Sequence, residues 1–257
     1  MGAERLMPDV LIDARIFGNG VNFSGRSNKV ELSIEAEEFD ATVFEPDNPA
    51  DAGWRARRGT VLDSKAAFSG FWTAGDPSKV DNALWSQLGT VNAWSFVRGK
   101  GAPGDICWFT QALTAKYQVF GDYGKPAPFD GAISGSWPLI RGTVAHPHTT
   151  ARSANGAGVD VPFTGAVPAG QYLYAALQVV SVAGTATPTL SVVVESDSVA
   201  GFTAPVQRLA FAPATGIGAQ VARVAGPFTD THFRVRWTVA GTSPSFLFCG
   251  ALGVAPA

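Results

Sequence analysis

The chain has 257 residues, 29 glycines, 17 prolines and a formal net charge of −2, and only 16% of its residues are charged. This turn-rich composition is typical of a compact β protein and excludes a coiled coil or a disordered tail. A net charge so close to zero also disfavours wrapping a polyanion through many Lys and Arg contacts, which depends on counterion release.

The N-terminus carries no apolar run after its charged residues, and nowhere do eighteen apolar residues follow one another. The sequence therefore predicts neither a secretion signal nor a membrane span. We expect a soluble protein that is made in the cytoplasm.

The charged residues divide the chain unequally. Residues 1–150 carry 14 basic and 17 acidic side chains, whereas residues 151–257 carry 5 and 4. The small, glycine-containing segment 151–158 between them is typical of a linker. We therefore expect a first domain at 1–150, a linker at 151–158 and a second domain at 159–257.

The first part predicts strands with one polar face and a single helix. Apolar residues alternate with polar ones at 10–16 and 29–38, the period of a half-buried strand, and the second set has an acidic outer face. A helix is expected at 77–88, with Asp76 as its cap, Gly89 closing it, and Val80, Leu84 and Leu88 along one apolar stripe. The segment 44–59 between these elements is predicted to be a long loop.

The second part contains no helix candidate. Short apolar runs separated by Gly, Pro and Thr turns predict an antiparallel β-sandwich of the jelly-roll or Ig-like kind. On one strand, Phe233, Val235 and Trp237 are expected to be buried, while Arg234 and Arg236 face solvent. The fold class is therefore mainly β: a sandwich or barrel with one short helix, followed by a sandwich.

Residues that could carry chemistry are few. Cys107 and Cys249 lie in apolar runs and are expected in the core, and His146 and His148 read as solvated linker residues. His232 is expected on the surface. The sequence contains no serine-hydrolase elbow, phosphate loop or zinc-helix motif. We therefore predict no enzyme activity, no metal site and no cofactor.

Three carboxylates share one face of the strand at 29–38: Glu31, Glu35 and Glu37. A glycosidase pair must face across a cleft, so we interpret them as a solvated face. The loop at 44–59 holds four residues that suit a contact between subunits, namely Trp54, Arg55, Arg57 and Arg58. A loop of this length is either disordered or functional.

Two motifs, Asp40-x-Thr42 and Gly70-Phe-Trp-x-x-Gly75-Asp76, follow each other in a chain of early strands, long loop, helix and further strands. With this order of elements, residues 9–146 resemble the tail tube (major tail) proteins of long-tailed bacteriophages. The second part resembles β-sandwich additions on some tail proteins, and its Arg234-Val-x-Trp237 belongs to a pattern similar to one in actinobacterial phage tail proteins. Many single-domain tube proteins stop where the linker begins, so the role of residues 158–257 stays open.

The resemblance implies a structural virion protein that forms stacked homo-oligomeric rings, expected to be hexameric, and contacts other tail proteins. DNA would pass through the bore during ejection without specific binding, and no membrane is involved. Glu31, Glu35 and Glu37 would face the bore, where carboxylates repel phosphates. The protein would reside in the virion tail, after assembly in the host cytoplasm.

Other functions remain open on the sequence alone. The second part could bind a host polysaccharide or receptor, which would require a groove lined by exposed aromatic residues. A capsid decoration protein or a tail terminator is an alternative within the structural class, and a hydrolase of unfamiliar type is a further alternative.

Overall fold

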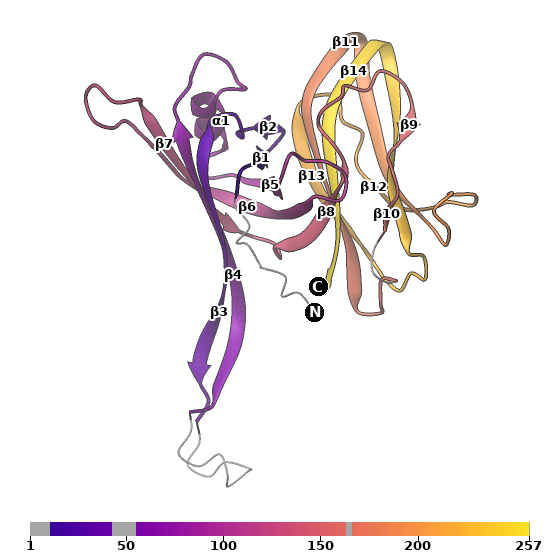
Figure 1. Cartoon of the computed structure of the whole chain (residues 1–257), viewed down its shortest axis with the longest axis horizontal. Helices are drawn as coiled ribbons and strands as arrows, with labels where there is room; N and C mark the ends of the chain where they lie inside the picture. The colour runs from indigo at the N-terminus through magenta and orange to yellow at the C-terminus, as the bar shows by residue number, and fades with distance from the viewer. Residues whose placement is uncertain (1–10, 43–54, 163–165, 257) are drawn as a thin grey trace, which may run out of the picture.

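The structure is a computed structural model that describes residues 11–42, 55–162 and 166–256 (Figure 1). Within these ranges it is mainly β, as predicted, with one short helix, α1 (Val80–Gln87). All named strands belong to one sheet and pair in antiparallel fashion. The strands are β1 (Ala14–Gly18), β2 (Val21–Asn22), β3 (Ser27–Asp40), β4 (Arg57–Phe71), β5 (Val91–Arg98), β6 (Ile106–Val119), β7 (Pro128–Gly135), β8 (Ile140–His146), β9 (Gly156–Ala157), β10 (Val161–Pro162), β11 (Gln171–Asp197), β12 (Val206–Ala210), β13 (Gly218–Ala225) and β14 (His232–Pro256).

The first part of the chain is a sheet that packs around an aromatic core. Its strands follow the order β1, β5, β6, β7, β4, β3. Trp94 lies at the centre, with ring centroids 5.6 Å from Phe23 and 5.3 Å from Phe68. From α1, Val80 and Leu84 are buried in the same core, as their spacing predicts, whereas Leu88, the third residue of the predicted stripe, follows the helix and is 43% exposed.

The helix is shorter than the sequence predicts, because Asp76 does not cap it. The Asp76 carboxylate instead accepts a hydrogen bond at 2.9 Å from the backbone N–H of Ser78, which makes a separate turn before α1. Gly89 follows the helix with φ 77°, as expected of a closing glycine. In the described ranges, no helix has the length and apolarity that crossing a membrane requires.

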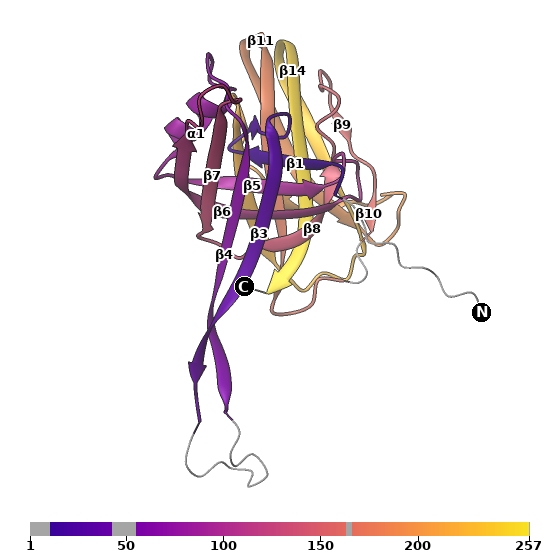
Figure 2. The ribbon, with the colours of Figure 1, turned by 60° about the vertical axis from the view of Figure 1, so that its left-hand side comes forward.

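Strands β3 and β4 form a long hairpin that projects away from the rest of the molecule (Figures 1 and 2). Its register runs from Ser27 opposite Gly70 to Asp40 opposite Arg57. The prediction of a loop up to residue 59 was wrong at its end, because β4 already begins at Arg57. β4 pairs with β3 from Arg57 to Gly70, so these residues form one continuous strand.

The second part is built on a ribbon of two very long strands, β11 and β14. Register shifts around residues 183–189 leave the pairing continuous through the predicted turns. Each long strand therefore replaces two shorter ones predicted from the sequence, at 172–182 and 189–195, and at 232–239 and 246–254.

This ribbon encloses the larger hydrophobic core. Leu173 and Leu177 from the first half of β11 share one cluster with Val192 from its second half, so the two halves of the ribbon pack face to face. Phe233 and Trp237 of β14 are buried in the same cluster, as their alternation predicts. β12 and β13 extend opposite halves of β11.

The two parts share a sheet and a core. β8 of the first part pairs with β14, and the buried side chain of Gln178 accepts from the Gly20 amide at 2.9 Å and donates to the Ala93 carbonyl at 3.1 Å. Gly20 has φ 79°, and a Cβ there would lie 2.4 Å from the Val179 carbonyl oxygen. Within the segment expected as a linker, β9 pairs with β14. The division into separate domains stays a prediction.

Candidate assembly interface

The projecting hairpin gathers carboxylates on one of its two faces. Glu31 lies opposite Ala67 and Glu35 opposite Asp63. Because paired residues share a face and successive residues alternate, these three carboxylates stand on the same side. Glu31 and Glu35 are exposed, and Glu37 follows at a register irregularity between β3 and β4.

Two lysines partly neutralise the negative charge of this face. The Lys29 ammonium lies 2.8 Å from a Glu31 oxygen, and the Lys65 ammonium lies 2.6 Å from an Asp63 oxygen. The hydrogen bond to Asp63 raises the pKa of Lys65. Because all four side chains are solvent-exposed, these pairs contribute little to stability. The face therefore holds both signs of charge, with carboxylates in excess, rather than the purely acidic surface expected from residues 29–38 alone.

The opposite face of the hairpin is apolar, and its outer half is uncovered. Near the base, Val30 and Leu32 are half-buried against the aromatic core. Further out, Ile34 is 54% exposed and Leu62 is 73% exposed. Fully burying one such side chain is worth about 1.5–3 kcal/mol, so this face favours association with another surface.

One edge of the hairpin is open. Among the described strands, β3 pairs with β4 and with no other. Its second row of backbone N–H and C=O groups is thus available for another strand, which is the usual hazard of a long edge. An edge of fourteen residues is long for a protein that works alone.

The base of the hairpin is held by a polar cluster next to α1. The Trp72 indole N–H lies 3.1 Å from both the Asp81 carboxylate and the Tyr117 hydroxyl. The Tyr117 hydroxyl also donates to Asp81 at 2.5 Å. Burial, reinforced by this bond, raises the pKa of Tyr117. The cluster therefore ties the end of β4 to α1 and β6.

Three of the four residues predicted for a contact between subunits lie at or next to the hairpin's outer end. Arg57 and Arg58 are the first two residues of β4, and the Arg57 guanidinium lies 2.6 Å from the Glu38 carboxylate. Arg55 is exposed just before the strand. Trp54 lies outside the described residues. The role of these four residues in a contact stays a prediction.

The prediction of solvated linker histidines was wrong. His146 ends β8 and is fully buried, its ring stacked on Phe248 at a centroid distance of 4.2 Å. Its Nδ1 lies 3.1 Å from the Phe248 carbonyl oxygen, and the Arg152 guanidinium donates to its Nε2. Burial, together with the nearby Arg152 charge, lowers the pKa of His146 to about 4. His148 is half-buried, and His232 is a partly buried partner of Asp160 at 2.6 Å.

The two arginines of β14 face a buried acid rather than only solvent. Glu195 is on β11, directly opposite Arg234, and its side chain is 6% exposed. Arg234 lies 3.1 Å from the Glu195 carboxylate, and Arg236 also donates to it. Paired in this way, Glu195 is a structural residue of the sandwich.

The two cysteines of the chain lie in its core. Cys107 and Cys249 are free and buried, as expected for core residues, and burial raises the pKa of Cys249 to about 12. In residues 11–42, 55–162 and 166–256, no group of three or more His, Cys, Asp or Glu side chains could hold a metal ion. The projecting hairpin, with its uncovered apolar face and its open β3 edge, is the candidate functional surface.

The comparisons with known proteins are distant. No family model matches the chain, and no curated protein matches it. A chain from the tail of an empty gene transfer agent particle with C6 symmetry is 16% identical, over 44% of this chain and 80% of that chain, with a TM-score of 0.36. The Dit protein of phage SPP1, described as a hub adsorption apparatus, is 9% identical over 94% of this chain and 99% of its own, with a TM-score of 0.32. With TM-scores below 0.5, these likenesses carry no conclusion about function.

Proposed function

We propose that this chain is a structural, non-enzymatic subunit of a phage tail tube, whose copies close into rings that stack around a channel for DNA. The observation that carries the proposal is the projecting hairpin, with an uncovered apolar face and an open β3 edge. An isolated chain gains nothing from either feature. A neighbouring copy would cover the first and complete the second.

The charged face of the hairpin, which carries Glu31 and Glu35, suits the wall of a channel. Glu31, Glu35 and Glu37 would face the bore and repel phosphates, so that DNA passes without being held. The two lysines of this face, Lys29 and Lys65, each lie next to a carboxylate, Glu31 and Asp63, so the face keeps an excess of negative charge.

The remaining predicted contacts fit the same arrangement. Arg55, Arg57 and Arg58 lie at or next to the outer end of the hairpin, and Trp54 directly precedes Arg55 in the sequence. There they would contact other subunits of the tail. The second part, whose described aromatic residues are mostly buried, would form the outer layer of the tube and not a binding groove.

The test is assembly of the purified full chain, followed by negative-stain microscopy and light scattering. The wild type should form annuli or tubes as its concentration rises. Leu62→Glu puts a charge on the exposed apolar face of the hairpin and should keep the protein monomeric. The matched control is Val206→Glu on β12, where the wild-type residue is 46% exposed but far from the hairpin, and this variant should assemble normally. A wild type that stays monomeric at every concentration would contradict the proposal.

A further inference from the structure

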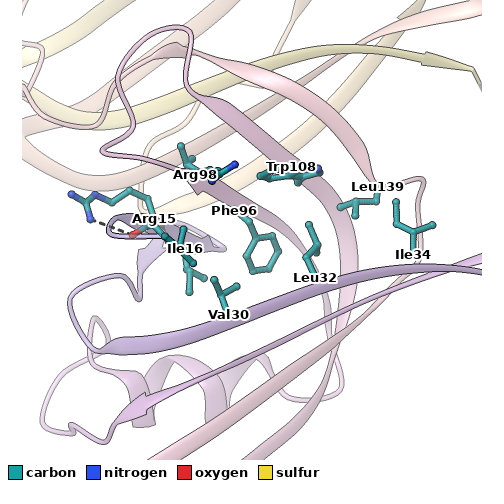
Figure 3. Close-up of a pocket in the computed structure, with 12 residues that line it drawn as sticks. Arg15, Ile16, Val30, Leu32, Ile34, Phe96, Arg98, Trp108 and Leu139 are labelled. Carbon is teal, nitrogen blue, oxygen red and sulfur yellow. Dashed lines mark hydrogen bonds between the residues drawn. The ribbon is translucent and has the colours of Figure 1, made fainter. Parts of the chain in front are cut away.

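An open trough lies between the inner half of β3 and the strands at the other end of the same sheet. It has a volume of about 420 Å³. Figure 3 shows Val30, Leu32 and Ile34 in a row along β3, on the opposite side of the trough from Phe96 and Trp108. Most of its lining is apolar, and Arg15 and Arg98 are the charged residues among it.

The trough exists because the curved sheet does not close. β1 and β3 are the two ends of the strand order in the first part, and no pairing joins them. β2 covers β1 only at Phe17 and Gly18. A second hollow of about 220 Å³ separates the same two strands and is lined by Asp13, Lys29 and their neighbours. The gap between β1 and β3 therefore has a strand edge on each side, apolar walls at the trough and more polar walls at the second hollow.

The floor of the trough continues directly into the uncovered face of the hairpin. Ile34 belongs to both: it lines the trough and is 54% exposed. Two positions further along β3, Ala36 pairs with Leu62, which is 73% exposed. One ribbon thus has an apolar groove at its base and an apolar surface without cover at its outer end, displaced from each other along the strand direction.

We propose that the trough is the acceptor site for the outer half of the hairpin of a second copy of this chain, an assignment that rests on the tube function proposed above. Donor and acceptor are different surfaces of one chain, so the contact is head-to-tail and leaves one unused donor and one unused acceptor after each addition. Such a contact repeats along the ribbon direction, which is what stacking of successive rings requires. Leu62 of the incoming hairpin, together with Ala36 opposite it on β3, would enter the trough between β1 and β3.

A mixing experiment with two defective variants tests this polarity. Leu62→Glu removes the donor and keeps the acceptor, whereas Leu11→Glu places a charge in the trough and keeps the donor. Both leucines are more than half exposed, so the folded subunit should melt at the wild-type temperature. For each variant alone, the protein concentration at which half of the subunits are assembled should rise at least roughly tenfold. This rise corresponds to a loss of about 1.4 kcal/mol of binding free energy per contact. Mixed together, they should form a discrete two-chain complex in analytical ultracentrifugation, without further growth.

A second acceptor variant, Leu139→Glu, guards against an effect peculiar to residue 11, and it should behave like Leu11→Glu. If both acceptor variants assemble like the wild type while Leu62→Glu does not, the trough is not the acceptor, although the tube function stands. If the wild type itself never assembles, the tube function fails and this inference with it. Native mass spectrometry that finds a small apolar ligand bound to the wild-type monomer, lost in both acceptor variants, would also overturn the assignment.

Discussion

The two long antiparallel ribbons of this chain differ in how far their apolar faces are covered. The ribbon of β11 and β14 doubles over and receives β8, β10, β12 and β13 at its edges, so that most of its apolar side chains are buried. The hairpin of β3 and β4 has the same alternation of apolar and polar residues, yet the apolar face of its outer half is left uncovered by the other described residues (Figure 2). Alternation specifies which side chains share a face, whereas the cover for that face depends on the rest of the chain or on another molecule.

The largest expected difference between the two ribbons is in the cost of removing a phenylalanine. Phe248 of β14 is fully buried, so Phe248→Ala should lower the free energy of unfolding by about 3–5 kcal/mol. Phe39 of the hairpin is 50% exposed, so Phe39→Ala should change it by no more than about 0.5 kcal/mol. Urea unfolding of the monomer measures both. Equal losses would mean that the hairpin is covered within the monomer.

Acid should weaken the β11–β14 ribbon and not the hairpin. His146 stacks on Phe248, and its pKa is lowered to about 4 from the usual value of 6.5. The folded protein then binds fewer protons than the unfolded chain between these values, so stability is complete above pH 6.5 and falls towards pH 4, by up to about 3 kcal/mol.

Urea unfolding at a series of pH values should show this slope in the wild type. His146→Phe keeps a ring against Phe248 and should make the slope shallower, leaving the smaller contribution of His148, whose pKa is also lowered by burial. An unchanged slope in the variant would mean that another group is responsible for the acid sensitivity.

The junction between the two parts should depend on one amide side chain. Gln178→Ala leaves the buried Gly20 amide without its acceptor and should cost about 1–3 kcal/mol. Gln118→Ala, on an exposed position of β6, is the matched control and should cost almost nothing. Thermal unfolding followed by circular dichroism compares them. If Gln178→Ala is as harmless as the control, the contact between the parts is weaker than its geometry implies.

The smallest effect on folding is expected from charge reversal on the hairpin. The double variant Glu31→Lys with Glu35→Lys changes exposed residues, so its stability should stay within about 0.5 kcal/mol of the wild type. Its assemblies should nevertheless retain DNA at low salt and release it as salt rises, because lysines in the bore would bind phosphates. The neutral pair Glu31→Gln with Glu35→Gln controls for loss of the ion pair alone. DNA retention that is identical in all three proteins would place these residues outside the bore.

Local patterns in the sequence predicted much of the fold. Alternation identified β3 and the buried face of β14 around Trp237, and the spacing of Val80 and Leu84 identified the helix. Local patterns gave the wrong prediction where pairing with a strand distant in the sequence determines the secondary structure. Residues 183–188 look like a turn between two strands, but pairing with β14 carries β11 through them.

The same limit applies to the candidate site. The acidic face of residues 29–38 was visible in the sequence, but Lys65, which tempers it, reaches that face only through the β3–β4 register. His146 looked solvated because it stands beside a proline and a glycine-containing segment, whereas the cover over it comes from Phe248, 102 residues later. The trough is lined by residues of four strands, β1, β3, β5 and β6, so no local sequence pattern predicts it.

Cryo-electron microscopy of the concentrated full chain tests the central claim most directly. We expect stacked rings in which the hairpin of each subunit contacts a neighbouring copy and Glu31 and Glu35 face the bore. Monomers at every concentration, or rings whose channel is walled by lysine and arginine, would contradict the account.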